Sequence, residues 1–151
     1  LPLAILRSDA RFTLLDSQQK RIDFLQDTVS RLGLKNVECV CLRAEEAPPE
    51  YRESFDIVTS RAVARLNVLA ELCLPFVKLG GSFIAMKALD CEEERQEAQN
   101  AAHELGGSFP DLRRYDIPFS DTGRALIVIG KAAPTPAKYP RRWAKITKQP
   151  L

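Results

Sequence analysis

The sequence predicts an α/β fold built on a doubly wound, mostly parallel sheet that ends in an antiparallel pair of strands. Along residues 11–106, apolar runs of strand length alternate with segments whose apolar residues recur every three or four positions. Two strand-like runs near residues 115–119 and 125–129 then follow each other with only a short turn between them. Strands that alternate with helices favour a parallel sheet covered on both faces, and the closing pair favours an antiparallel edge.

The first part of the chain contains three predicted strands and one predicted helix. Residues 11–16 form a short apolar run that ends in an acid, and Ser17 offers an N-cap for an amphipathic helix that ends at Gly33. The apolar runs at 37–42 and 55–60 predict the next two strands. The segment between these two strands contains adjacent prolines, so we expect a loop there.

The remaining elements follow the same alternation. A second helix is predicted from Leu66, and Pro75 must end or kink it. The two adjacent glycines that follow predict a turn before a strand at 82–86. Asp90 has a glutamate three residues later, which predicts a capped helix with acids in its first turn, and Gly106 ends it.

The composition is that of a globular protein of one domain. The chain has 151 residues, of which 45% are apolar and 28% charged. No apolar run approaches the ~20 residues that a membrane span needs. The four cysteines form no C-x-x-C pair and only one histidine is present, so we expect no metal site. Four reduced cysteines are typical of a cytoplasmic protein.

Positive charge is concentrated at the C-terminal end. Residues 131–151 carry six basic residues and no acid, whereas the rest of the chain carries sixteen basic residues and twenty acids. The six are Lys131, Lys138, Arg141, Arg142, Lys145 and Lys148. Any attraction to a polyanion is therefore expected from this segment.

Several segments, in order along nearly the whole chain, resemble the bacterial ribosomal RNA small-subunit methyltransferase G family, also called glucose-inhibited division protein B. The combination of SRAVA with the later KYPR is the most specific part of the resemblance. The matching segments are LPLAI at 1–5, FTLLDSQQKRIDFL at 12–25, RAEE at 43–46, DIVTSRAVARL at 56–66, ELCLPFVKLGG at 71–81 and TPAKYPRR at 135–142.

The resemblance implies the fold of the S-adenosylmethionine-dependent methyltransferases. In that family LPLAI directly follows a glycine-rich loop, which closes the first, central strand and cradles the cofactor. We therefore expect this strand and its loop to precede Leu1. Residues 1–133 are expected to form the catalytic domain, and residues 134–151 a basic, proline-rich tail. Because every predicted core element lies before the tail, we expect cofactor binding to survive its removal.

The candidate cofactor residues follow the ends of predicted strands. Ligands of open parallel sheets bind beyond the carboxyl ends of the strands, where Asp16 can accept hydrogen bonds from the ribose hydroxyls of an adenosine. On position alone, Asp16 suits a helix cap equally well. The resemblance implies that Asp16 and the adjoining Ser17 contact the cofactor, that Ala44 and Glu45 flank the adenine, and that Arg61 lies at the cofactor site.

The candidate RNA contacts are basic. Phosphate contacts supply affinity for RNA, and aromatic side chains stack on unpaired bases, so the tail with its tyrosine and tryptophan is a candidate RNA-binding segment. Arg65 and, more weakly, Lys87 are further candidates near the expected cleft. The tail residues expected to contact small-subunit ribosomal RNA are Lys138, Arg141, Arg142 and Lys145.

The expected reaction is methyl transfer to N7 of a guanine in 16S ribosomal RNA. N7 is an unprotonated acceptor on the edge of the base, so no general base is needed and no catalytic residue is predicted. Alignment of the reactants can supply most of the acceleration. Two alternatives remain open. A carboxylate after the second strand also suits a nicotinamide-dependent oxidoreductase, and the chain could be a non-catalytic RNA-binding module. We expect a monomer.

Overall fold

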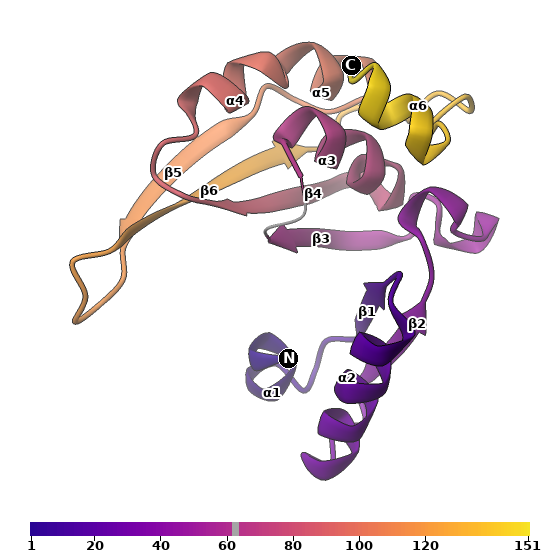
Figure 1. Ribbon diagram of the computed structural model, residues 1–151, viewed down its shortest axis with the longest axis vertical. Coiled ribbons are helices and arrows are strands. Elements are labelled where there is room, and N and C mark those ends of the chain that lie inside the picture. The colour runs from indigo at the N-terminus through magenta and orange to yellow at the C-terminus, as the bar shows by residue number, and fades with distance from the viewer. Residues whose placement is uncertain (62–63) are drawn as a thin grey trace. The chain divides into compact units, whose positions relative to one another are not determined.

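The computed structural model describes residues 1–61 and 64–151 and divides the chain into two compact units, residues 1–47 and 48–151 (Figure 1). Each unit is described by itself below. None of the helices in these ranges is both long enough and apolar enough to cross a membrane.

The first unit contains a two-stranded parallel sheet. Its strands are β1 (Phe12–Asp16) and β2 (Val37–Cys41), paired in register so that Asp16 lies opposite Cys41. The helix α2 (Gln19–Arg31) connects them, as the apolar spacing predicted, and Gly33 ends it with a left-handed φ of 64°. The unit also contains α1 (Pro2–Leu6) and the 3₁₀ turn η1 (Ala44–Glu46).

The second unit contains a four-stranded mixed sheet in the order β3-β4-β6-β5. The strands are β3 (Phe55–Arg61), β4 (Val77–Lys87), β5 (Asp111–Asp116) and β6 (Gly123–Gly130). The β3–β4 pair is parallel, whereas β6 is antiparallel to both β4 and β5, so the predicted closing hairpin is confirmed. Its first strand lies about four residues earlier than the predicted 115–119.

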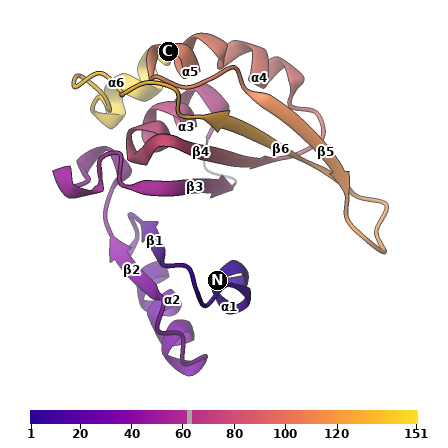
Figure 2. The same cartoon turned by 180° about the vertical axis from the view of Figure 1, so that it is seen from behind.

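Four helices lie on one side of this sheet in both views (Figures 1 and 2). They are α3 (Leu66–Cys73), α4 (Glu92–Glu97), α5 (Gln99–Glu104) and α6 (Trp143–Lys148). Alternate residues of the central strands are fully buried, as expected where one face of a strand packs on helices. These core residues include Phe83 and Ala85 on β4 and Ala125, Ile127 and Ile129 on β6.

The predicted turn at the two adjacent glycines is wrong. Strand β4 continues through Gly80 and Gly81, and its register against β3 shifts between Phe55 and Ile57. Gly80 takes a left-handed φ of 79°, and a Cβ on Gly81 would lie 2.5 Å from the Asp56 carbonyl oxygen. The glycines therefore permit an irregularity inside a long strand. From the sequence alone, two adjacent glycines used in this way look the same as two glycines in a turn.

The capping box predicted at Asp90 is also wrong. The N-cap of α4 is Cys91, which makes no side-chain capping hydrogen bond, and the predicted single helix is interrupted at Ala98. Three glutamates do occupy the first turn of α4, where the helix dipole favours negative charge. Gly106, with a φ of 81°, follows the end of α5, close to the predicted stop.

The C-terminal tail, residues 134–151, is packed rather than solvated. Tyr139 is 4% exposed and Ile146 is fully buried, so both belong to the apolar core of the second unit. Thr135 is also buried, and residues 143–148 form α6 despite the nearby prolines. Core side chains therefore come from the tail as well, so the expectation that every core element lies before residue 134 is wrong.

Candidate functional site

Asp16 lies at the carboxyl end of β1, as predicted. Its Oδ1 accepts a hydrogen bond from the backbone N–H of Gln18 at 2.8 Å, and its Oδ2 accepts one from Arg21 Nη1 at 3.2 Å. Its side chain is 26% exposed, so the carboxylate remains accessible to solvent. The N-cap of α2 is Gln18, so the capping role expected of Ser17 is wrong. The Asp16 carboxylate instead orders the turn into the helix.

An open hollow of about 540 Å³ borders Asp16. Its other lining residues come from the beginning of α2, namely Gln18, Lys20, Arg21, Phe24 and Leu25. Two cations and an exposed aromatic ring thus line the same hollow as the carboxylate. Arg21 was not singled out from the sequence, although its place in the first turn of the helix that follows a strand-end acid is a usable signal.

Ala44 and Glu45 lie in η1, just beyond the end of β2. Because β1 and β2 are parallel and in register, these residues follow the same edge of the sheet as Asp16. The Leu42 N–H donates to the Asp16 carbonyl at 3.0 Å, which extends the pairing toward this edge. The Glu45 side chain is only 8% exposed and lies 3.7 Å from Arg43. Four of the predicted cofactor residues therefore share one edge of the first unit.

The fifth predicted cofactor residue, Arg61, lies in the second unit. It is the last residue of β3, is exposed, and pairs with Met86 on β4. Lys87 follows at the end of β4, where its Nζ donates to Glu94 Oε1 at 2.6 Å and to the Ala64 carbonyl at 2.8 Å. The Lys87 side chain is only 13% exposed, so this ammonium is held in place at the carboxyl edge of the sheet.

The predicted RNA contact Arg65 is the N-cap residue of α3 and is exposed. Its guanidinium lies 2.5 Å from Glu97 Oε2, and this hydrogen bond raises the pKa of the arginine. An exposed ion pair of this kind is weak and exchanges readily with solvent or a phosphate. Arg65 is thus partnered but accessible.

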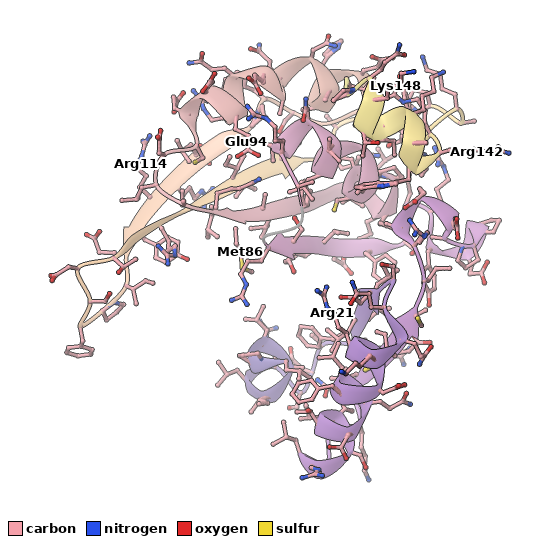
Figure 3. The ribbon with its side chains drawn as sticks, in the orientation of Figure 1. Arg21, Met86, Glu94, Arg114, Arg142 and Lys148 are labelled. Carbon is pink, nitrogen blue, oxygen red and sulfur yellow. The ribbon has the colours of Figure 1, made fainter. Side chains whose placement is uncertain are left out.

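The tail cations have different surroundings. Arg142, labelled in Figure 3, and Lys145 are both exposed. Neither has an ion-pair partner in the described part of the chain. Lys138 is exposed and lies 3.1 Å from Glu104 Oε1. Arg141 is directed inward, where its Nη2 lies 2.6 Å from Oε2 of the fully buried Glu71. The hydrogen bond to Glu71 raises the pKa of Arg141.

Lys131, counted above with the basic tail, is buried as well. Its Nζ donates to the carbonyls of Leu74 at 3.0 Å and Leu105 at 3.3 Å, and to the Thr135 hydroxyl. Burial lowers the pKa of this ammonium, while Glu53 at 3.2 Å opposes the shift. Two of the six basic residues in the segment, Lys131 and Arg141, are therefore structural. Their partners, Glu53 and Glu71, were not predicted from the sequence.

A protein-family model described as rRNA small subunit methyltransferase G matches residues 1–111. Two relatives bearing the name ribosomal RNA small subunit methyltransferase G align over the whole chain. The protein from Clostridium perfringens is 45% identical and that from Deinococcus radiodurans 49% identical. The chain spans 64% and 60% of their respective lengths, which is less than two thirds.

Solved structures of low identity share the fold. A mutant of the 16S rRNA (adenine(1408)-N(1))-methyltransferase from Catenulisporales acidiphilia superposes with a TM-score of 0.70 at 13% identity, over 89% of this chain and 79% of that one. M. jannaschii TYW2 in complex with AdoMet gives 0.59 at 15% identity, over 78% and 55%. These neighbours establish the fold class predicted from the sequence, that of the S-adenosylmethionine-dependent methyltransferases. The family is shown by the match of its model to residues 1–111, about three quarters of the chain: the chain belongs to the rRNA small subunit methyltransferase G family.

Proposed function

We propose that the protein transfers a methyl group from S-adenosylmethionine to N7 of a guanine in 16S ribosomal RNA. The observation that carries the proposal is the family match over residues 1–111, which includes an accessible carboxylate, Asp16, at the carboxyl end of β1. The names of the relatives supply the class of RNA. The choice of guanine N7 comes from the resemblance described above.

The polar groups at this edge of the first unit fit an adenosine. The Asp16 carboxylate can accept hydrogen bonds from two ribose hydroxyls, for which Arg21 would release its 3.2 Å contact. Ser17, Ala44 and Glu45 follow the same edge and would contact the adenine end of the cofactor. Arg61, exposed at the end of β3, would pair with the carboxylate of the methionine portion.

The proposed reaction makes few demands on side chains. The bound cofactor supplies a methyl group that its sulfonium already activates. N7 carries no proton, so no residue has to act as a general base before attack. The protein's contribution is then to align the base, which can be worth ~7–11 kcal/mol.

The RNA contacts that we propose are the exposed cations Arg65, Lys138, Arg142 and Lys145, which can pair with phosphates. Arg141, also expected there from the sequence, is engaged by the buried Glu71, and we assign it to holding the tail. We further propose a cytoplasmic monomer without a bound metal. Light scattering of the purified full-length protein and elemental analysis test the last two statements.

Incubation of the full-length protein with S-adenosylmethionine and 16S ribosomal RNA, free or in small subunits, tests the proposed function. Nuclease digestion followed by mass spectrometry should reveal 7-methylguanosine. A methyl group on another atom would overturn the N7 assignment alone. Affinity for a nicotinamide dinucleotide without affinity for S-adenosylmethionine would favour the oxidoreductase alternative, and RNA binding without affinity for either would favour a non-catalytic module.

A further inference from the structure

A carboxylate without any exposure, Glu71 on α3, lies beneath the basic tail. Its Oε1 accepts hydrogen bonds from the Arg141 backbone N–H at 2.9 Å and from Arg141 Nε at 2.8 Å. Its Oε2 accepts one from Arg141 Nη2 at 2.6 Å. Glu71 thus holds the side chain and the backbone of one tail residue with both of its oxygens. A buried carboxylate in such an arrangement depends on its partner, because an unpaired buried charge is strongly unfavourable.

Other side chains of the second unit hold the tail backbone on the N-terminal side of Arg141. Arg52 donates to the carbonyl oxygens of Tyr139 at 2.8 Å and Thr135 at 2.5 Å. The Thr135 N–H donates to Glu53 Oε1 at 2.7 Å. The Tyr139 hydroxyl donates a hydrogen bond to the Glu104 carboxylate. Burial of the tyrosine raises its pKa, and this hydrogen bond raises the pKa further.

The contacts on the C-terminal side of Arg141 orient α6. Ile146 is fully buried on one side of this helix, which fixes the direction of the exposed residues on the other side. Arg142 is the N-cap residue, and Lys145 and Lys148 lie within the helix. Figure 3 shows Arg142 and Lys148 on the outer side of α6. All three cations are exposed, and within the described ranges none has an ion-pair partner.

We infer that Glu71 is a positioning residue for RNA recognition. By holding Arg141, it keeps Arg142, Lys145 and Lys148 together on one fixed basic surface that takes the phosphates of an RNA strand. Cations that are already ordered lose less conformational freedom on binding than the same cations on a mobile segment. The inference rests on the proposed function for the class of ligand, but it concerns a residue that touches no RNA.

The test uses Glu71→Gln in the full-length protein, with binding to a 16S ribosomal RNA fragment measured well below the melting temperature. Removal of a negative charge should by itself strengthen RNA binding. We expect the opposite, a loss of affinity of about tenfold, because the cations lose their fixed positions. Trypsin should also cut faster after Lys138 and Arg142. Glu50→Gln, an equal change of charge at an exposed residue, is the matched control: it should leave the cleavage rate unchanged and should strengthen RNA binding slightly rather than weaken it.

The second arm neutralises the three cations, as Arg142→Gln, Lys145→Gln and Lys148→Gln together. This triple variant should reduce the slope of log affinity against log salt by about two units. In a protein that already carries Glu71→Gln, the triple change should reduce RNA affinity less than it does in the wild type, because Glu71→Gln has already weakened the contacts of these three cations. If Glu71→Gln does not fold, Arg52→Gln releases the tail without leaving a buried carboxylate unpaired, and the same loss is expected.

The inference would be overturned if Glu71→Gln made the tail easy to cut but left RNA affinity unchanged. Additive effects of Glu71→Gln and the triple change on RNA affinity would also overturn it. A triple variant that binds as tightly as the wild type would also overturn it, while methyl transfer by that variant would leave the proposed function intact. A wild-type protein that methylates no RNA defeats the proposed function itself.

Discussion

Two arginines that are adjacent in the sequence have opposite surroundings. Arg141 is directed inward onto the buried Glu71, whereas Arg142 is exposed at the start of α6. The same contrast separates Lys131, whose side chain is fully buried, from the exposed Lys145. At the scale of single residues, burial rather than residue type therefore decides which cations remain for a ligand.

Asp16→Ala should weaken binding of S-adenosylmethionine by about 1.5–3 kcal/mol, the usual loss when a charged hydrogen-bond acceptor is removed. Calorimetry on the full-length protein measures the change. Asp16 also accepts the Gln18 N–H at the start of α2, so Asp16→Asn, which keeps an acceptor oxygen, is the matched control for folding. Unchanged affinity in both folded variants would remove Asp16 from the cofactor site.

Arg61→Ala should abolish measurable methyl transfer and leave the melting temperature nearly unchanged. The side chain is exposed at the end of β3 and no ion pair joins it to the described residues, so its truncation costs little packing. Thermal unfolding and a methyl-transfer assay on the same preparation test both halves. A large fall in melting temperature together with activity would show that Arg61 has a structural role.

At the level of secondary structure, the pairing of β4 with β3 determines the conformation of the two adjacent glycines. The adjacent glycines lie within the strand because β3 pairs with β4 on both sides of the irregularity, with Phe55 opposite Val77 and Ile57 opposite Ser82. Such an irregularity needs a close approach of backbones, which only a residue without a Cβ permits.

Gly81→Ala should destabilise the protein more than Gly80→Ala. A Cβ on Gly81 would lie 2.5 Å from the Asp56 carbonyl oxygen and 2.9 Å from Val77 Cγ1, so the backbone must shift at a cost of about 1–3 kcal/mol. A Cβ on Gly80 meets nothing within 4 Å and costs only the strain of a left-handed φ, about 1 kcal/mol. Urea unfolding of the two variants decides this. Equal losses would mean that the close approach to β3 is absent in solution.

At the scale of the whole molecule, the tail closes the second unit. Contacts reach it from three separate places in the chain, namely Arg52, Glu104 and the helix α3 with Glu71 and Asn67. The Asn67 contact is a 3.4 Å hydrogen bond to the Leu151 carbonyl. The residues that hold the tail are thus far from it in sequence, and the tail contributes to the core in return.

Truncation after Ala133 should destabilise the second unit by at least about 3 kcal/mol, because it removes the Arg141 partner of the Glu71 carboxylate. It also removes the buried side chains of Tyr139 and Ile146. Chemical unfolding of the full-length protein and of the truncated form measures the difference. Neutralisation of only the exposed Arg142, Lys145 and Lys148 is the control, and it should change stability little. A truncated form as stable as the control would contradict the packing described here.

Sequence patterns were enough to predict the alternation of strands and helices between residues 11 and 130, the fold class and the family, but not α1 or α6. The elements and the fold class depend on a local signal, the spacing of apolar residues along the chain. The family was identified instead from the resemblance of whole segments, of which SRAVA and KYPR are the most specific. The strand expected ahead of Leu1, the boundary at residue 133 and the cofactor and RNA contacts of individual residues stay predictions. The folded structure was needed to show that the two glycines lie within β4, that α4 has no capping box and that two of the six basic residues are structural. Each of these depends on a partner distant in sequence or on burial, as with Glu71 and Arg141, and local patterns carry no information about such partners.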